Sequence, residues 1–368
     1  MDGNLFMKNI LVTGGAGFIG SNFIHFILSN TTDIHITNLD ALTYAGNPEN
    51  LSDLKFDSRY KFIHGNINNS QILDGIFQET PIDNIIHFAA ESHVDRSITD
   101  PLLFIQTNIL GTANLLLHAK RYWTGLDSQS KSSFRFLHIS TDEVFGSLKI
   151  EEPAFTENTP YAPNSPYAAS KASSDHLVRS YFHTYDFPVI ITNCSNNYGS
   201  YQYPEKLIPL VISNAVNGES LPIYGDGKQI RDWLYVQDHC EALYTVLQLG
   251  TPGESYNIGG NNQPTNLEVV QMICKILDEF LPGTKFIPHA NLIEFVKDRP
   301  GHDRRYAMDI TKIRQELGWQ PKETLESGLH KTIRWYLDNK DWINTTLGKE
   351  AHKNWLTQNY EGRGEEDK

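Results

Sequence analysis

Residues 8–30 read KNILVTGGAGFIGSNFIHFILSN, and this stretch decides the fold. A short apolar run is followed by glycines at positions 14, 17 and 20, and then by an apolar segment with helical spacing. Glycines in this pattern permit a tight turn, close approach of a pyrophosphate and close packing of helix on strand, while the N-terminus of the helix faces the phosphates. The order of strand, glycine turn and helix therefore predicts a dinucleotide-binding site.

Asp40 ends a second predicted strand, DIHITNLD (33–40), about 20 residues after the glycine turn. A carboxylate at this place accepts hydrogen bonds from both ribose hydroxyls and repels a 2′-phosphate, so NAD is favoured over NADP. Ala89 and Ala90 end another predicted strand, NIIHFAA (84–90), where small side chains let a cofactor approach. Tight helix packing is an alternative explanation of these two alanines.

The first half of the chain alternates β-branched runs with helical segments, for example 107–122, 134–140 and 188–195. This alternation predicts an α/β fold with a doubly wound, parallel, Rossmann-type sheet. After Gly199, loops rich in proline and glycine indicate a smaller C-terminal α/β lobe that binds substrate. We predict an NAD-binding domain over 7–199 that also receives parts of 236–260, a substrate lobe over 200–345, and a solvated tail over 346–368.

The composition argues against several classes of protein. The chain has 368 residues, of which 39% are hydrophobic and 20% charged, as in a globular protein of about two domains. The net charge of −13 argues against binding to nucleic acid or an anionic membrane, and no apolar run reaches the ~20 residues of a spanning helix. The first residues lack a signal-peptide pattern, the three cysteines are far apart, and the histidines lack metal-ligand spacing. We therefore expect a cytoplasmic protein with reduced thiols and no metal.

Two adjacent acids, Asp142 and Glu143, follow the predicted strand 134–140 in the segment STDEVFG (140–146). Charge is costly to bury at such a place, so two carboxylates in succession require a chemical reason. Mutual repulsion and partial burial raise one of the two pKa values, which leaves an acid beside a base. The residues themselves do not decide which of the two is the acid.

Tyr167 and Lys171 lie four residues apart in SPYAASKASS (165–174), at the start of a predicted helix, and face the same side of it. A neighbouring ammonium lowers the pKa of a tyrosine, which is ordinarily about 10. A Tyr-x-x-x-Lys pair alone is commonly just a helix surface, but Thr141 ends the strand upstream and can bond a substrate hydroxyl beside the tyrosine. Together with the glycine turn, these residues predict oxidation of an alcohol: Tyr167 removes the hydroxyl proton and NAD+ takes the hydride.

The motifs resemble the extended short-chain dehydrogenase/reductase family, whose members mostly act on nucleotide sugars. The resemblance runs from about 8 to 335 and rests on GGAGFIG (14–20), YAASK (167–171) and the spacing between Thr141 and Tyr167. Further segments, such as LTYAGN (42–47), PIYGDGKQIRDWLYV (222–236) and DRPGHDRRYAMD (298–309), are similar to the nucleotide-sugar 4,6-dehydratases of this family. Epimerases of the family lack the acid pair, because they perform no elimination.

The resemblance implies a hydro-lyase that converts dTDP-glucose into dTDP-4-keto-6-deoxyglucose and water. Tyr167, with Thr141 and Lys171, is expected to take the C4 hydroxyl proton while hydride passes to NAD+. Glu143 is then expected to remove the C5 proton, and Asp142, held protonated, to give its proton to the leaving C6 oxygen. Hydride returns to C6, so NAD is expected to be retained through turnover.

The resemblance also implies two sets of contact residues. The cofactor residues are Gly14, Gly17, Phe18, Ile19, Gly20, Asp40, Leu42, Thr43, Asn66, Ile67, Ala89, Ala90, Ser92, Thr107, Tyr167, Lys171 and Asn197. The substrate residues are Ser92, Thr141, Asn196, Lys206, Leu207, Pro222, Tyr224, Arg231, Asn266, Asp298, Arg299, His302 and Tyr306.

One cofactor position departs from the family, which usually has Asp-Ile where this chain has Asn66-Ile67. An Asn oxygen still accepts a hydrogen bond from the adenine amino group, so we expect a modestly altered affinity for NAD. The family generally forms homodimers through two helices, which here correspond to 108–122 and 167–185.

Two alternative functions remain open. A nucleotide-sugar 4-epimerase uses the same tyrosine and NAD without the acid pair. A catalytically silent NAD-binding regulator needs only the glycine turn, although the intact Thr141, Asp142, Glu143, Tyr167 and Lys171 argue against it.

Overall fold

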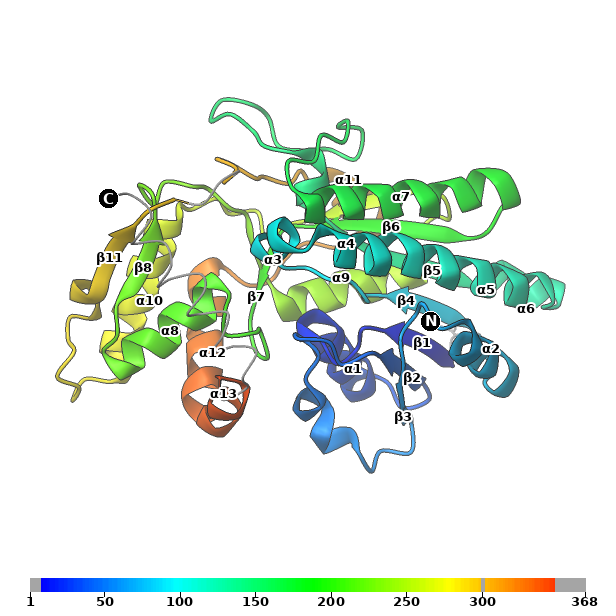
Figure 1. Cartoon of the computed structure of the whole chain (residues 1–368), viewed down its shortest axis with the longest axis horizontal. Helices are drawn as coiled ribbons and strands as arrows, with labels where there is room; N and C mark the ends of the chain where they lie inside the picture. The colour runs from blue at the N-terminus through cyan, green and yellow to red at the C-terminus, as the bar shows by residue number, and fades with distance from the viewer. Residues whose placement is uncertain (1–7, 299–301, 348–368) are drawn as a thin grey trace.

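The computed structural model describes residues 8–298 and 302–347, and its centre is a seven-stranded parallel sheet (Figure 1). The strand order is β10-β6-β5-β4-β1-β2-β3, which places β1 and β4 side by side where the direction of winding reverses. The strands are β1 Asn9–Thr13, β2 His35–Asp40, β3 Tyr60–His64, β4 Asn84–His87, β5 Arg135–Thr141, β6 Val189–Cys194 and β10 Ser255–Ile258. The predicted doubly wound α/β fold is confirmed.

Helices cover both faces of this sheet because successive strand residues point to opposite sides. Ile10 and Val12 belong to the core shared with α1 and α9, whereas Leu11 between them belongs to the core on the opposite face, with α2, α5 and α7. The bounds of these helices are α1 Phe18–Asn30, α2 Ser70–Glu79, α5 Thr112–Thr124, α7 Pro166–Tyr185 and α9 Val236–Leu249. The sheet is therefore held between two buried apolar layers, one on each face.

The second lobe has its own core and lies beyond the carboxyl ends of the strands (Figure 1). It contains α8 Leu207–Asn217, α10 Asn266–Phe280 and α12 Leu325–Asp338, with the strand pairs β8 Leu221–Tyr224 with β11 Ile293–Val296 and β7 Asn196–Tyr198 with β9 Trp233–Tyr235. The chain crosses between the lobes more than once, since α9 packs on α1 and β10 pairs with β6. The predicted tail lies outside the described residues except for 346 and 347, which end α13, Lys340–Leu347.

Shorter elements connect these layers. They are η1 Pro48–Leu54, α3 Val94–Thr99, α4 Pro101–Phe104, the π-helical segment η2 Ile105–Gly111, α6 Ser128–Ser133, η3 Asp142–Phe145, η4 His289–Leu292 and α11 Thr311–Leu317. The continuous helical run Pro101–Thr124 is long and apolar enough to cross a membrane, although 44% of its most apolar window is buried inside the protein. Its exposed part is an apolar face that needs another explanation.

Candidate active site

A cavity of about 310 Å³ opens at the carboxyl ends of the central strands, between the two lobes. Most of the residues predicted for the cofactor, and all five predicted for catalysis, line it. These are Gly14, Gly17, Phe18, Ile19, Gly20, Asp40, Thr43, Asn66, Ile67, Ala89, Ala90, Ser92, Thr107, Thr141, Asp142, Glu143, Tyr167, Lys171 and Asn197. Two residues predicted for the substrate, Asn196 and Lys206, also line the cavity. Parallel strands present their carboxyl ends at one edge, which explains why residues far apart in sequence meet here.

The glycine turn fits a dinucleotide because it has no room for side chains. Gly14 has a φ of +75°, and a Cβ on it would lie 2.5 Å from the amide nitrogen of Ala89. A Cβ on Gly20 would lie 2.4 Å from the Gly14 carbonyl oxygen. Gly17 caps α1, so the first amide groups of this helix face the cavity, where they can bind an anion.

Asp40 stands at the end of β2 with its carboxylate held by the backbone. Its Oδ2 accepts from the Ala16 amide at 2.9 Å, and its Oδ1 accepts from the Leu42 amide at 2.7 Å. Burial raises the pKa of Asp40, and these two hydrogen bonds act against that rise. Leu42 does not line the cavity wall, and its amide orients Asp40; its contact with the cofactor stays a prediction.

Asn66 lies in the cavity wall after β3, where its Oδ1 accepts from the Asn68 amide at 2.8 Å. This local bond orients the side chain, and the oxygen keeps a second lone pair for another donor.

The acid pair begins where β5 ends, because Thr141 closes the strand and caps the short helix η3. The Thr141 hydroxyl accepts from the Glu143 amide at 3.3 Å and donates to Asp142 Oδ1 at 3.2 Å. Asp142 is buried, and its Oδ2 makes no hydrogen bond within the described residues. Burial, followed by the charge of Glu143, holds the pKa of Asp142 well above its usual range. The charged form of Asp142 is therefore disfavoured, whereas Glu143 is only partly buried.

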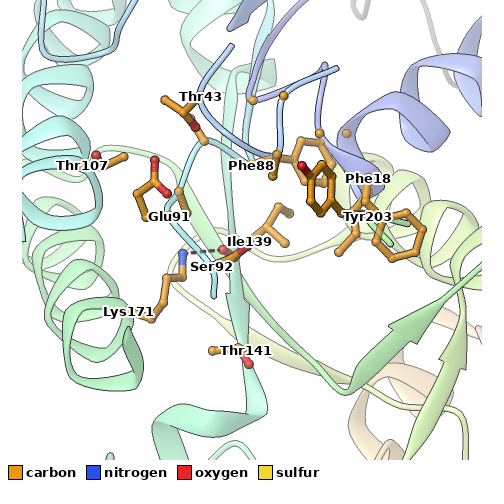
Figure 2. Close-up of a pocket in the computed structure, with 18 of the residues that line it drawn as sticks. Phe18, Thr43, Phe88, Glu91, Ser92, Thr107, Ile139, Thr141, Lys171 and Tyr203 are labelled. Atoms are coloured by element: carbon orange, nitrogen blue, oxygen red, sulfur yellow. Dashed lines mark hydrogen bonds between the residues drawn. The ribbon is translucent and has the colours of Figure 1, made fainter. Parts of the chain in front are cut away.

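Tyr167 and Lys171 face the cavity from the first turns of α7. Lys171 Nζ donates to the carbonyl oxygen of Ile139 on β5 at 2.8 Å (Figure 2). The pKa of Tyr167 lies well above its usual range, first because of burial and then because of the Glu143 carboxylate. This differs from the sequence-based expectation of a lowered pKa, because burial disfavours the charged phenolate. The positive charge of a bound nicotinamide acts in the opposite direction.

Asn108 was not predicted from the sequence, yet it organises this wall of the cavity. It lies in the π-helical segment η2, and its Oδ1 accepts from the Glu91 amide at 2.9 Å. Its Nδ2 donates to the Glu91 carbonyl at 3.0 Å and to Ser170 Oγ at 2.8 Å. The loop after β4 is thereby tied to α7. The signal available in the sequence was an Asn within an apolar helical run.

The cavity also contains Tyr44, Glu91, Tyr203 and Glu205, which the sequence analysis did not assign. Figure 2 shows Tyr203 beside Phe18 on one side of the cavity, and Glu91 with Thr43 on the other. Glu205 accepts from Arg96 Nη2 at 3.2 Å, and the Arg96 guanidinium lies 4.0 Å from the centre of the Tyr44 ring. These contacts join the loops after β2 and β4 to the second lobe.

The remaining predicted substrate residues lie in the second lobe outside the wall of this cavity. They are Leu207, Pro222, Tyr224, Arg231, Asn266, Asp298, His302 and Tyr306, while Arg299 lies outside the described residues. The Arg231 guanidinium lies 4.3 Å from the centre of the Tyr306 ring and lowers the pKa of Asp142 by its charge. His302 Nδ1 contacts Asp298 Oδ1 at 2.6 Å. This second group therefore adjoins the acid pair through Arg231.

No group of three or more His, Cys, Asp or Glu side chains within 8–298 and 302–347 is arranged to hold a metal ion.

Comparisons with known proteins agree on one relationship. A family model described as GDP-mannose 4,6 dehydratase matches residues 11–332. The chain is 57% identical to dTDP-glucose 4,6-dehydratase 1 of Escherichia coli K12 over 362 residues, which cover 96% of this chain and 99% of the relative.

Two solved structures are similar over 92% of this chain. The dTDP-glucose 4,6-dehydratase of Bacillus anthracis, solved in complex with NAD, is 47% identical, is covered over 99% of its length and gives a TM-score of 0.81. The dTDP-glucose 4,6-dehydratase of Streptomyces venezuelae, with NAD and TYD (thymidine diphosphate) bound, is 43% identical, is covered over 100% of its length and gives a TM-score of 0.82.

Proposed function

The chain belongs to the GDP-mannose 4,6 dehydratase family within the extended short-chain dehydrogenases/reductases, and we propose which of its residues perform each step of its reaction. Its activity is that of a dTDP-glucose 4,6-dehydratase. It removes water from dTDP-glucose and forms dTDP-4-keto-6-deoxyglucose. When bound, the cofactor NAD accepts a hydride from C4 and later returns it to C6. The observation that carries this function is the acid pair Asp142 and Glu143 in one cavity with Tyr167, since a 4-epimerase needs only the tyrosine.

Tyr167 is the base for the first step and takes the proton of the C4 hydroxyl. Thr141 lies in the same cavity wall and orients that hydroxyl. Lys171 supplies positive charge beside the ribose and the phenol, which favours the phenolate at the moment of proton transfer. This role is supported by the burial of both side chains, because charge interactions are strong where water is excluded.

Asp142 is the acid and Glu143 the base of the elimination. A ketone at C4 makes the C5 proton acidic, so Glu143 removes it while Asp142 gives its proton to the departing C6 oxygen. This division is supported by the different surroundings of the two groups, since burial raises the pKa of Asp142 well above its usual range while Glu143 is partly exposed. After water leaves, Glu143 returns its proton to C5.

The nucleotide of the substrate binds across the second lobe. Lys206 and Arg231 hold the diphosphate, to which a guanidinium can bind with two parallel hydrogen bonds. Pro222 and Tyr224 border the base, and Asp298, His302 and Tyr306 contact the sugar nucleotide beside them. Arg299 stays a predicted contact outside the described residues. Asn196, Leu207 and Asn266 complete the contacts, with Ser92 on the cofactor side.

The cofactor stays bound throughout turnover, because it ends each cycle in its starting oxidation state. Asp40 holds the ribose and Asn66 accepts a hydrogen bond from the adenine. The protein works in the cytoplasm, in keeping with three buried cysteines that form no disulfide.

The chain forms a homodimer through the helical run Pro101–Thr124 together with α7. This run carries an exposed apolar face, on which Leu102 is 72%, Leu117 57% and Leu110 56% exposed. Packing two such faces together removes this surface from water, and apolar faces of that kind are typical of obligate interfaces.

The test of function is incubation of the purified protein with dTDP-glucose. The 4-keto-6-deoxy product, detected by its absorbance in alkali, is the expected result, whereas dTDP-galactose as the sole product would identify an epimerase. Tyr167→Phe should bind NAD and form no product. A parallel incubation with UDP-glucose measures the preference for thymine, and faster turnover of the UDP-sugar would contradict the assigned substrate.

A further inference from the structure

Beneath Lys171 lies a carboxylate that no step of the reaction uses. Asp175 is one turn further along α7, so Tyr167, Lys171 and Asp175 share one face of the helix at intervals of four residues. The Asp175 side chain is fully buried and is not itself part of the cavity wall. An ionised group in such a place is retained only if other groups compensate for the loss of water.

Three side chains bond the Asp175 carboxylate. Ser140 Oγ donates to Oδ2 at 2.7 Å and Tyr161 Oη donates to the same oxygen at 2.9 Å. His138 Nε2 contacts Oδ1 at 3.1 Å. His138 and Ser140 flank Ile139, whose carbonyl accepts from Lys171. Consecutive turns of α7 therefore clamp three consecutive residues of β5, immediately before Thr141.

The negative charge of Asp175 also requires a positive charge nearby, which hydroxyl donors do not supply. His138 does not, because burial lowers its pKa to about 4 and the ring is neutral at physiological pH. Arg179, the next turn of α7, is directed elsewhere and donates to Ser255 Oγ at 3.1 Å and to Tyr161 Oη at 3.5 Å. Burial raises the pKa of Asp175, whereas the contacts with His138 and, after them, the charge of Lys171 lower it, so Lys171 is the cation that acts on Asp175 when His138 is neutral.

The charge of Lys171 depends in turn on the groups around it. Burial lowers its pKa, and the carboxylate of Asp175 is the main influence that raises it again. Cys194 on β6 faces Lys171 as a neutral thiol, because burial raises its pKa to about 12. His87 on β4 is likewise neutral, since burial lowers its pKa well below its usual range.

The remaining groups near Lys171 belong to the reaction itself. Tyr167, on the same helix, takes up a proton during the reaction, and burial raises the pKa of Asp142 and so favours its neutral form. Glu143 is the base and changes its charge during the reaction. Asp175 is thus the one negative charge facing Lys171, among the described residues, that stays constant through the cycle.

We propose that Asp175 is a positioning residue that keeps Lys171 protonated and fixes the register of α7 on β5, so that Tyr167 faces Thr141. This inference rests on the roles proposed for Tyr167 and Lys171. The compensating charge lies on the side of Lys171 away from the cavity, where neither substrate nor solvent displaces it. The buried carboxylate therefore acts on the ammonium before substrate arrives.

The first experiment uses Asp175→Asn, which preserves the shape of the side chain and removes its charge. Lys171 then loses its proton more readily, and the Tyr167 phenolate loses a cation that favours it. In a single turnover with dTDP-glucose, formation of enzyme-bound NADH should slow about tenfold or more at neutral pH, and its half-maximal rate should move to higher pH. The matched control is Tyr161→Phe, which removes one hydrogen bond to Asp175 and keeps the charge, so its pH profile should be that of the wild type.

A wild-type rate and pH profile in Asp175→Asn would overturn the proposal. An equal shift in Tyr161→Phe would also overturn it, because hydrogen bonding rather than charge would then be responsible. Failure of the wild type to form the 4-keto-6-deoxy product would instead contradict the proposed function, so the two failures are distinguishable.

A second experiment does not depend on activity. The melting temperatures of Lys171→Met, Asp175→Asn and the double variant form a mutant cycle, because removing one partner leaves a buried charge alone and removing both does not. The double variant should melt at a higher temperature than Lys171→Met. If Lys171→Met does not fold, the double variant should still fold. A double variant no more stable than Lys171→Met would show that the two groups are not paired and would overturn the proposal.

Discussion

The Thr141 hydroxyl donates a hydrogen bond of 3.2 Å to Asp142 Oδ1, while Asp142 Oδ2 is buried without a hydrogen-bond partner in the described residues. A carboxyl group held at one oxygen and unbonded at the other is oriented but not ionised, because its charged form lacks both water and donors. The free oxygen can carry a proton that only a bound ligand receives. This relationship separates Asp142 from Glu143, although the two residues are adjacent.

Replacement of this acid should slow elimination without preventing oxidation. Asp142→Asn keeps the hydrogen bond from Thr141 but has no proton to give to the C6 oxygen, so formation of 4-keto-6-deoxy product should fall by about 10²- to 10⁴-fold. Exchange of the C5 proton with deuterated solvent, followed by mass spectrometry, should persist because Glu143 is intact. Loss of this exchange in step with product formation would contradict the assignment of Asp142 as the acid.

Replacement of the base should stop the reaction one step earlier. Glu143→Gln lacks a carboxylate to remove the C5 proton, while Tyr167 and Lys171 still support oxidation at C4. Mixing the variant with dTDP-glucose should therefore produce enzyme-bound NADH, seen by its absorbance, with little release of product and no exchange at C5. Normal turnover of this variant would show that another residue is the base.

The fold was predictable because its determinants are local. The glycine turn at 14–20 and the ends of the strands before Asp40 and Thr141 follow from spacing and apolar runs, and the structure has strands and helices at these places. Packing details were not predictable. Asn108 lies in a π-helical segment and forms hydrogen bonds with the loop after β4. No periodicity in the sequence indicates this segment.

Electrostatic properties were harder still to predict from sequence. The spacing of Tyr167 and Lys171 indicates that they share a helix face, but not that Lys171 bonds the Ile139 carbonyl or that burial raises the pKa of Tyr167. Which acid is buried also depends on the second lobe, since Arg231 lies near Asp142. Such facts depend on contacts between residues far apart in the chain.

The glycine turn should not tolerate a methyl group at its closest point. Gly14→Ala places a Cβ 2.5 Å from the Ala89 amide at a φ of +75°, so β1 and the loop after β4 must separate. Affinity for NAD should fall at least tenfold and the protein should be less stable by about 1–3 kcal/mol. Calorimetric titration with NAD and thermal unfolding measure the two effects.

Two other glycines provide matched controls. Gly318 has a φ of +72° with open space around it, and Gly283 has open space without that conformation. Gly318→Ala should therefore lower the stability of the protein only through backbone strain, and Gly283→Ala should leave the stability almost unchanged. Equal affinity for NAD in the Gly14 and Gly318 variants would argue against close approach at Gly14.

The proposed dimer should dissociate when its apolar face is charged. Leu117→Glu introduces a carboxylate on α5, where the leucine is 57% exposed in a single chain, and burial of that charge against a second copy is costly. Sedimentation analysis should show monomers. Leu249→Glu, at the end of α9, alters a leucine that is 61% exposed and should leave the dimer intact. An unchanged dimer in Leu117→Glu would place the interface elsewhere.

Asp232 should make stability depend on pH. It is buried next to Arg231, with one oxygen accepting from the Gly260 and Asn262 amides and the other, Oδ2, without a partner in the described part of the chain. Burial raises its pKa to about 7, from 3.8 in the absence of the fold. The folded protein thus binds a proton that the unfolded chain releases, so stability is greatest below about pH 4 as far as this group is concerned and declines as pH rises to about 7.

The size of this decline is on the order of 4 kcal/mol, from about three pKa units. Asp232→Asn cannot ionise and should remove this part of the pH dependence while keeping an oxygen for the two amides. Chemical unfolding of both proteins between about pH 5 and pH 8 measures the difference. The Asn variant should become more stable relative to the wild type as pH rises. Parallel curves for the two proteins would mean that Asp232 stays ionised in the folded state.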